Sequence, residues 1–257
     1  MARTGTKEWS DHSKNICFGC KHNCIYCYQK ANMKRWKRIK TDEEWSQWKL
    51  NMGKLKEKPK KLDGRIMFPT THDIFPEILE QTVDYLKRWL VVGNEILIVS
   101  KPHLECVKRL CSELEPYKDK ITFRFTIGSE HQYTLDFWEK NAPQLTERMD
   151  SLKHAFNSGF QTSVSSEPFL DSCSEGIVDM VDPYITDTIW IGKMNRITER
   201  VPKEIWSDPE NEFMIELKST LEDDFVKHMY EILKDNQKVR WKDSYKKVLG
   251  LPEEDIG

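Results

Sequence analysis

The stretch Cys17-Phe-Gly-Cys20-Lys-His-Asn-Cys24-Ile-Tyr26-Cys27-Tyr28 holds four of the chain's seven cysteines within eleven positions. Three of them, Cys20, Cys24 and Cys27, follow the spacing C-x3-C-x2-C, with the aromatic Tyr26 before the last one. A 4Fe-4S cubane that takes three thiolate ligands keeps one iron open, whereas ferredoxin-type clusters take four. The spacing therefore predicts a cluster with a vacant coordination position on a compact loop. Cys17 fits the end of a strand, and we expect it to pack rather than to bind iron.

The same four cysteines also fit a second interpretation. Together they read C-x2-C-x3-C-x2-C, which supplies the four thiolates of a structural zinc site. Zinc ligand pairs usually lie about a dozen residues apart, and these do not. A zinc-stabilised binding protein is therefore kept as the alternative that is not an enzyme.

Composition indicates one folded domain without a membrane segment. The chain has 257 residues, of which 38% are hydrophobic and 32% charged. No apolar run approaches the roughly 18 residues that span a bilayer, and the polar start MARTGTKEWSDHSK lacks a secretory signal. We expect a cytoplasmic protein, whose thiols stay reduced in that compartment.

Short β-type runs alternate with amphipathic stretches along most of the chain. This alternation predicts an α/β fold, specifically a partial (β/α)6 TIM-type barrel of mainly parallel strands. Residues 1–200 would form the barrel and residues 201–257 a C-terminal helical extension packed on it. The expected strands are a weak first one at 15–17, then 65–69, 95–100, 121–127, 161–165 and 188–191. The expected helices are 28–36, 76–90, 104–114, 145–156, 212–233 and 241–249.

The cysteine motif and the strand ends resemble the radical S-adenosylmethionine (SAM) superfamily, and the chain from Cys17 to Leu249 is similar to proteins of the spore photoproduct lyase type. The second strand leads into Phe68-Pro-Thr-Thr-His-Asp73-Ile-Phe-Pro-Glu77, where that superfamily binds the SAM amino group. The resemblance implies a 4Fe-4S cluster and SAM as cofactors. The residues that it implies at the amino-group position are Thr70, Thr71, His72 and Asp73.

Later segments resemble further parts of a SAM site. Lys101 follows the third strand, where the resemblance implies a contact with the SAM carboxylate and an exposed loop lysine is the alternative. Glu139 and Arg148 would pair near SAM, although a surface ion pair explains them almost as well. The remaining implied SAM contacts are Tyr26 beside the cluster, the ribose-binding hydroxyls of Thr126 and Ser129, and Glu167 in the segment Ser165-Ser-Glu-Pro168 beside the adenosine.

One departure from the family concerns its hydrogen donor. Spore photoproduct lyases carry a hydrogen-donating cysteine at the end of the second strand, where this chain has Thr70. Cys173, just past the fifth strand, is the alternative catalytic thiol, and an ordinary buried cysteine is the competing interpretation. Cys106 and Cys111 lie on a helical pattern, so we expect them to pack.

The activity implied by the resemblance is reductive cleavage of SAM to methionine and a 5'-deoxyadenosyl radical, which removes hydrogen from a substrate. A ferredoxin or flavodoxin is the expected electron donor, docking where Lys21 and His22 offer positive charge. Nucleic acid is one substrate hypothesis, because residues 30–61 hold twelve Lys or Arg against four Asp or Glu, interleaved with Trp36, Trp45 and Trp48. Solvated helix faces with core tryptophans are the competing interpretation, and a protein or small-molecule substrate is the alternative.

Overall fold

A seven-stranded sheet in which every neighbouring pair is parallel organises the molecule. The structure, a computed structural model, describes residues 5–172 and 175–252. The strand order is β1-β4-β5-β6-β7-β8-β9, and a separate antiparallel pair joins β2 to β3. The strands are β1 His12–Ser13, β2 Cys17–Phe18, β3 Lys49–Leu50, β4 Arg65–Phe68, β5 Glu95–Ser100, β6 Ile121–Thr126, β7 Gln161–Ser166, β8 Ile189–Ile191 and β9 Val239–Trp241. The predicted α/β class is confirmed, and the curved sheet is compatible with a partial barrel.

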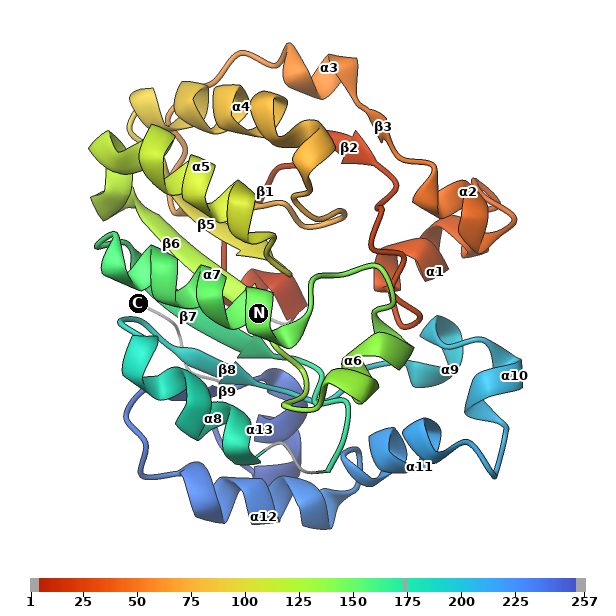
Figure 1. Ribbon diagram of the computed structural model, residues 1–257. Helices are drawn as coiled ribbons and strands as arrows, with labels where there is room; N and C mark the ends of the chain where they lie inside the picture. The colour runs from red at the N-terminus through yellow and green to blue at the C-terminus, as the bar shows by residue number, and fades with distance from the viewer. Residues whose placement is uncertain (1–4, 173–174, 253–257) are drawn as a thin grey trace.

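Four helices follow the strands around the outside of the sheet (Figure 1): α4 Leu79–Val91, α5 Leu104–Leu114, α7 Leu145–Asn157 and α8 Glu175–Val181. In α4 the buried residues include Val83, Leu86 and Leu90, at the spacing that places side chains on one helical face. Burying such a stripe against the sheet forms the main core. The predicted helices at 76–90, 104–114 and 145–156 are therefore confirmed to within a few residues.

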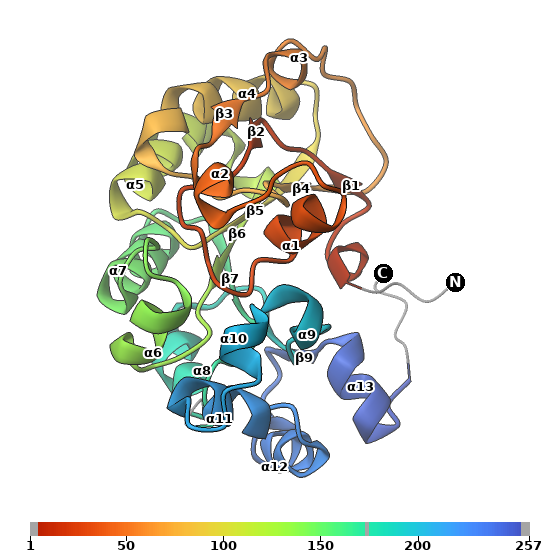
Figure 2. The same cartoon turned by 90° about the vertical axis from the view of Figure 1, so that its right-hand side faces the viewer.

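Shorter helices gather at the end of the barrel that follows the carboxyl ends of the strands. Figure 2 shows α1 and α2 above α9 and α10 over this end. The remaining helices are η1 Gly5–Glu8, α1 Tyr28–Arg35, α2 Asp42–Ser46, α3 Met52–Leu55, η2 Pro76–Ile78, η3 Glu115–Lys120, α6 Gln132–Trp138, η4 Asp182–Tyr184, α9 Ile197–Arg200, α10 Lys203–Trp206, α11 Glu212–Ser219, α12 Asp223–Leu233 and α13 Asp243–Leu249.

Two expectations about the edges of the sheet are wrong. The first parallel strand is His12–Ser13, while the expected strand at 15–17 gives way to β2, which pairs antiparallel with β3. Near the C-terminus, β9 adds a parallel strand beside β8 where a polar connection between the expected helices 212–233 and 241–249 was predicted. Both edge strands are two or three residues long, so neither carries a period that sequence reading can detect.

The two ends of the described chain meet along one seam of the barrel. The Lys242 ammonium is fully buried, forms an ion pair with Glu8 and donates a hydrogen bond to the carbonyl oxygen of Gly5 at 2.7 Å. It also lies 4.3 Å from the centre of the Trp9 ring, which packs edge-on against Trp190. This contact fastens the N-terminal segment against the end of β9. Among the described residues, no helix is long and apolar enough to cross a membrane.

Candidate cluster and cofactor site

The cysteine loop runs from β2 into α1. Cys20 donates its backbone N–H to the carbonyl oxygen of Trp45, and Cys27 caps α1 by accepting from the N–H of Lys30. Gly19 adopts φ +85°, and a Cβ there would lie 2.6 Å from the Trp45 carbonyl oxygen. Glycine is therefore required at this position, because an L side chain is strained at that φ and would clash with the loop's own anchor.

Cys24 and Cys27 lie close enough to Cys20 for their charges to affect its pKa, and Cys17 stands apart. Burial raises the pKa of Cys20 well above its usual value, and the charges of Asp73, Cys24 and Cys27 add to it. Burial also raises the pKa of Cys24, to about 12. The pKa of Cys17 is raised to about 12 by burial alone, and its side chain belongs to the main core, as predicted.

The three thiols are compatible with the ligand set of a cubane. Among the described residues, no three His, Cys, Asp or Glu side chains converge as ligands of one ion. A cubane does not need that convergence, because each thiolate binds a different iron. The buried thiols of Cys20 and Cys24, with their raised pKa values, stay protonated on their own, so a bound cation is what would hold these two as thiolates.

Asp73 fastens the cysteine loop to the ends of β4 and β5. One carboxylate oxygen accepts from the Ser100 hydroxyl and the Ile74 N–H, and the other accepts from the Lys101 N–H at 3.0 Å and lies 3.2 Å from Nδ1 of His22. Burial alone would raise the pKa of Asp73, but His22, Lys101 and Ser100 outweigh it and hold that pKa far below its usual value. Both oxygens already have partners from the protein.

His72 and the two threonines before it join β4 to the start of the cysteine loop. Nε2 of His72 accepts from the Ile16 N–H at 3.1 Å, Nδ1 donates to the Asp73 carbonyl oxygen, and burial lowers its pKa to about 4. The Asn15 side chain donates to the Thr70 hydroxyl and accepts from the Thr71 N–H. Asn15 is a residue that sequence reasoning missed, since a lone polar residue before a short strand gives no signal.

A buried network surrounds Glu139 at the end of α6. Its carboxylate accepts a hydrogen bond from the Tyr26 hydroxyl, lies 2.5 Å from Nη2 of Arg148 and 3.7 Å from Nζ of Lys101. Neither the Glu139 nor the Arg148 side chain is exposed, so the alternative of a surface ion pair is wrong. The Lys101 side chain is only 14% exposed and lies 5.7 Å from the centre of the Tyr26 ring, so it is not a free loop lysine.

The residues predicted to contact the SAM ribose and adenosine differ in whether their side chains already have partners within the protein. Thr126 is partly exposed, its carbonyl oxygen accepts from Arg148 at 3.2 Å, and its hydroxyl has no hydrogen-bond partner among the described residues. The Ser129 hydroxyl is buried, donates to Asp171 and accepts from the His131 N–H. Glu167 lies 3.5 Å from Nζ of Lys242, and burial raises its pKa. Cys173 lies outside the described residues.

Two expected charge and stacking features are arranged differently from the prediction. His22 is 1% exposed and turns toward Asp73, while Lys21 forms an ion pair with Glu77, so the two do not form a positive patch. Trp45 is buried against Phe18, and Trp48 packs on Phe75. Trp36 alone of the three tryptophans is widely exposed, at 51%. The core interpretation therefore holds for two tryptophans of the basic stretch.

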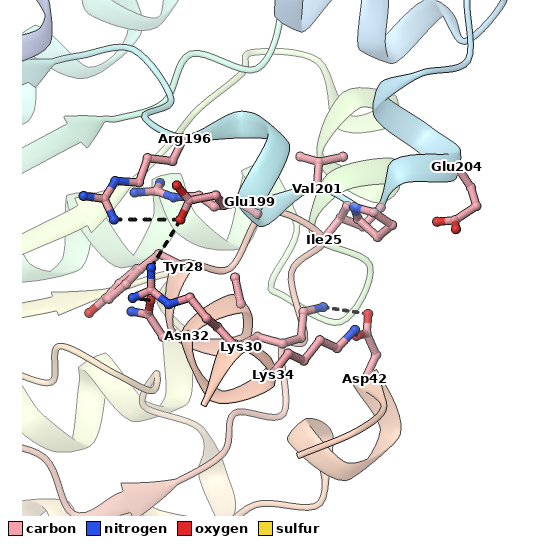
Figure 3. A pocket seen from close by; sticks show the side chains of 14 residues that line it. Ile25, Tyr28, Lys30, Asn32, Lys34, Asp42, Arg196, Glu199, Val201 and Glu204 are labelled. Carbon is pink, nitrogen blue, oxygen red and sulfur yellow. Dashed lines mark hydrogen bonds and ion pairs between the residues drawn. The ribbon is translucent and has the colours of Figure 1, made fainter. Parts of the chain in front are cut away.

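A pocket of about 800 Å³ lies next to the cysteine loop, between α1 and α9. Figure 3 shows Tyr28 and Asn32 of α1 facing Arg196 and Glu199 at the start of α9. Sequence reasoning missed the α9 wall, because a four-residue helix after β8 carries no recognisable period.

Comparisons with known proteins find structural likeness but no sequence relative. No protein-family model matches the chain, and no curated protein matches it. Spore photoproduct lyase complexed with dinucleoside spore photoproduct is 12% identical over 89% of this chain and 75% of that one, with a TM-score of 0.57. A mutant of that lyase with bound AdoMet and the same dinucleoside gives 12%, the same coverage and 0.56. Streptococcus suis SuiB bound to S-adenosylmethionine is 10% identical over 87% of this chain and 48% of that one, with a TM-score of 0.53. The chain has the fold of radical SAM proteins of the spore photoproduct lyase type.

Proposed function

We propose that this protein is a radical SAM enzyme that binds a 4Fe-4S cluster through Cys20, Cys24 and Cys27. The observation that carries the proposal is that the loop with these three thiols is held at the carboxyl ends of β4 and β5, where His22 lies 3.2 Å from Asp73 and Asp73 accepts from the Lys101 N–H. Ligands of parallel α/β barrels bind at that end of the strands. The fold shared with two radical SAM proteins supports the same assignment.

A cluster bound there would supply the electron that cleaves the SAM sulfonium to methionine and a 5'-deoxyadenosyl radical, which abstracts hydrogen from the substrate. The chain's part is to orient SAM and to exclude water. Lys101 is the candidate for the SAM carboxylate, because it lies at the end of β5 and electrostatically close to Cys24. The Thr126 hydroxyl is the candidate for ribose. Glu139, itself held by Arg148 and the Tyr26 hydroxyl, lies 3.7 Å from the Lys101 ammonium and positions it.

The partners of Asp73 and His72 give these two residues a positioning role. Asp73 is occupied by Ser100, Lys101 and Ile74, and both ring nitrogens of His72 are used. We infer that they fix the cysteine loop relative to β4, leaving the Thr70 and Thr71 side chains and Glu167 as the nearer candidates for SAM. A ferredoxin or flavodoxin remains the proposed electron donor.

The substrate stays open between nucleic acid and a protein or small molecule. One structural neighbour is spore photoproduct lyase in complex with a dinucleoside, and another is SuiB bound to a precursor peptide. With Thr70 in the place of a donor cysteine, the repair reaction of spore photoproduct lyases is not proposed for this chain.

Anaerobic reconstitution with iron and sulfide tests the proposal. We expect about four iron atoms per chain, since a cubane contains four, and release of 5'-deoxyadenosine from SAM after reduction. Stoichiometric zinc without iron would instead establish the zinc-stabilised alternative. An intact cluster that never cleaves SAM would reject the enzymatic assignment.

A further inference from the structure

The pocket between α1 and α9 is a concave site that Ile25 of the cysteine loop helps to line. Its α1 wall includes Tyr28, Asn32 and Arg35, which are spaced to share one helical face. Its volume of about 800 Å³ falls in the range of sites for small organic ligands. A site of this shape suits part of a substrate better than the flat contact that a protein partner makes.

Ion pairs already neutralise two of the three carboxylates in the pocket wall. Asp42 lies 2.9 Å from Nζ of Lys30 and also pairs with Lys34. Glu199 lies 3.5 Å from Arg35 and 3.8 Å from Arg196, and Figure 3 shows the Arg196 contact with Glu199. Five basic side chains thus face three acidic ones, and the pocket is positive overall.

Arg200 is the basic wall residue that has no ion pair within 4 Å in the described part of the chain. Its guanidinium is partly buried and lies 5.8 Å from the centre of the Tyr28 ring. The carboxylate with the largest electrostatic influence on it is Glu167, which lies 3.5 Å from Nζ of Lys242. A partly buried guanidinium without an ion pair has donors available for an anionic ligand.

The pocket adjoins the proposed reaction site. Tyr28 directly follows the cluster ligand Cys27, and its hydroxyl donates a hydrogen bond to the carbonyl oxygen of Thr70 at the end of β4. Arg200 also interacts electrostatically with Cys27. A ligand group held by Arg200 would therefore lie beside the cluster loop. One small substrate could then contact both Arg200 and the proposed reaction site.

We propose that this pocket binds a phosphate group of the substrate, carried by a free nucleotide or by a nucleic-acid strand. The inference rests on the proposed function and adds the substrate's chemical class. Arg35, Arg196 and Arg200 present three guanidinium forks, whose planar geometry matches phosphate oxygens. The half-exposed Tyr28 ring offers an aromatic surface beside them for a base.

The test measures binding by fluorescence anisotropy of labelled hexathymidylate, with unlabelled thymidine monophosphate, pyrophosphate and a hexaglutamate peptide as competitors. The reconstituted wild-type chain is compared with Arg200→Gln and with Arg38→Gln. Arg38 is an exposed basic residue of the same 30–61 stretch that does not line the pocket. We expect Arg200→Gln to weaken binding about tenfold. The slope of log affinity against log salt concentration should also become shallower, by the amount that corresponds to about one phosphate contact. Arg38→Gln should change affinity less than about twofold.

Each outcome decides the matter. Competition by the monophosphate at comparable affinity identifies a free nucleotide as the source, and a strong preference for the hexamer identifies a strand. Equal losses in both variants, or competition by hexaglutamate alone, would overturn the inference. If Arg200→Gln fails to fold, Arg196→Gln replaces it, because Arg196 is 65% exposed. SAM cleavage measured on the same samples separates the two claims: cleavage without selective binding rejects the pocket alone, and binding without a cluster rejects the enzyme.

Discussion

Nη2 of Arg148 lies 2.5 Å from Oε2 of Glu139, and neither side chain has any exposed surface. The pair joins α7 to the end of α6, and Lys101 and Tyr26 bring the end of β5 and the cysteine loop to the same carboxylate. A buried pair of this kind is not in itself stabilising relative to apolar residues, but removing one partner strands the other.

Glu139→Gln should therefore destabilise the protein strongly. The substitution leaves Arg148 buried without a counter-charge, and we expect the free energy of unfolding in urea to fall by about 3 to 5 kcal/mol. Glu115→Gln is the matched control, because Glu115 pairs with Lys118 on the surface with 60% of its side chain exposed. A change of no more than about 0.5 kcal/mol is expected there. Similar small losses of unfolding free energy in both variants would contradict the role of Glu139 as the buried counter-charge of Arg148.

The separation of Cys17 from the other three cysteines predicts a qualitative difference among single variants. Alanine at Cys20, Cys24 or Cys27 should abolish reconstitution of a stable cluster, measured as iron and sulfide bound per chain. Cys17→Ala should retain the full iron content, because Cys17 packs in the main core. Cys106→Ala controls for the loss of a buried thiol away from the loop. Iron lost equally from the Cys17 variant would revive the four-cysteine interpretation.

His72 makes stability depend on pH in a defined window. Its pKa is lowered to about 4, whereas in the unfolded chain it titrates near 6.5. Its contribution is therefore complete above about pH 6.5 and is lost as the pH falls toward 4, because the unfolded chain takes up a proton that the folded chain excludes. The difference amounts to roughly 3 kcal/mol at the acid end.

Urea unfolding between pH 7 and pH 5 measures about 2 kcal/mol of this contribution. His72→Gln keeps an acceptor for the Ile16 N–H and should flatten the pH dependence of the free energy of unfolding. Part of the slope should persist, since the pKa of His103 is lowered as well, chiefly by burial. The carboxylates Asp73 and Glu139, whose pKa values are also lowered, contribute to the pH dependence of the free energy of unfolding only below about pH 4.5. An unchanged slope in the His72 variant would refute this account.

What the sequence could reveal was set by periodicity and local spacing. The strands 95–100 and 121–126 and the helix 104–114 are long enough to show an apolar pattern, and they were located to within a residue. The two-residue β1 and the three-residue β9 were missed, because their strand character comes from neighbours far along the chain. Glu139 and Arg148 were paired correctly by resemblance, but their burial depends on tertiary packing. Asn15 and Arg200 gain their contacts only when distant segments meet.

The seam of the barrel yields a prediction about distant chain ends. Lys242→Met keeps much of the side-chain volume but leaves Glu8 buried without its cation, so we expect the free energy of unfolding to fall by about 3 kcal/mol. Lys247→Met, in the helix α13 that begins directly after Lys242 and with 67% of its side chain exposed, should change it by less than about 0.5 kcal/mol. Tryptophan fluorescence should also shift in the Lys242 variant alone, because its ammonium lies over Trp9.

Thr126 and Ser129 were both proposed as ribose contacts, and their hydrogen bonds predict opposite behaviour on substitution. In the described part of the chain the Thr126 hydroxyl has no hydrogen-bond partner, and the residue is partly exposed at the end of β6. Thr126→Val should therefore leave stability nearly unchanged and weaken SAM binding about tenfold, the usual scale for one lost hydrogen bond at a bound ligand.

The Ser129 hydroxyl is already engaged with Asp171 and His131. Ser129→Ala should cost about 1 to 2 kcal/mol of stability and leave the Kd for SAM unchanged, as measured by equilibrium dialysis of the reconstituted protein. A large rise in that Kd for Ser129→Ala, with none for Thr126→Val, would reverse the assignment and mean that SAM displaces the Asp171 contact.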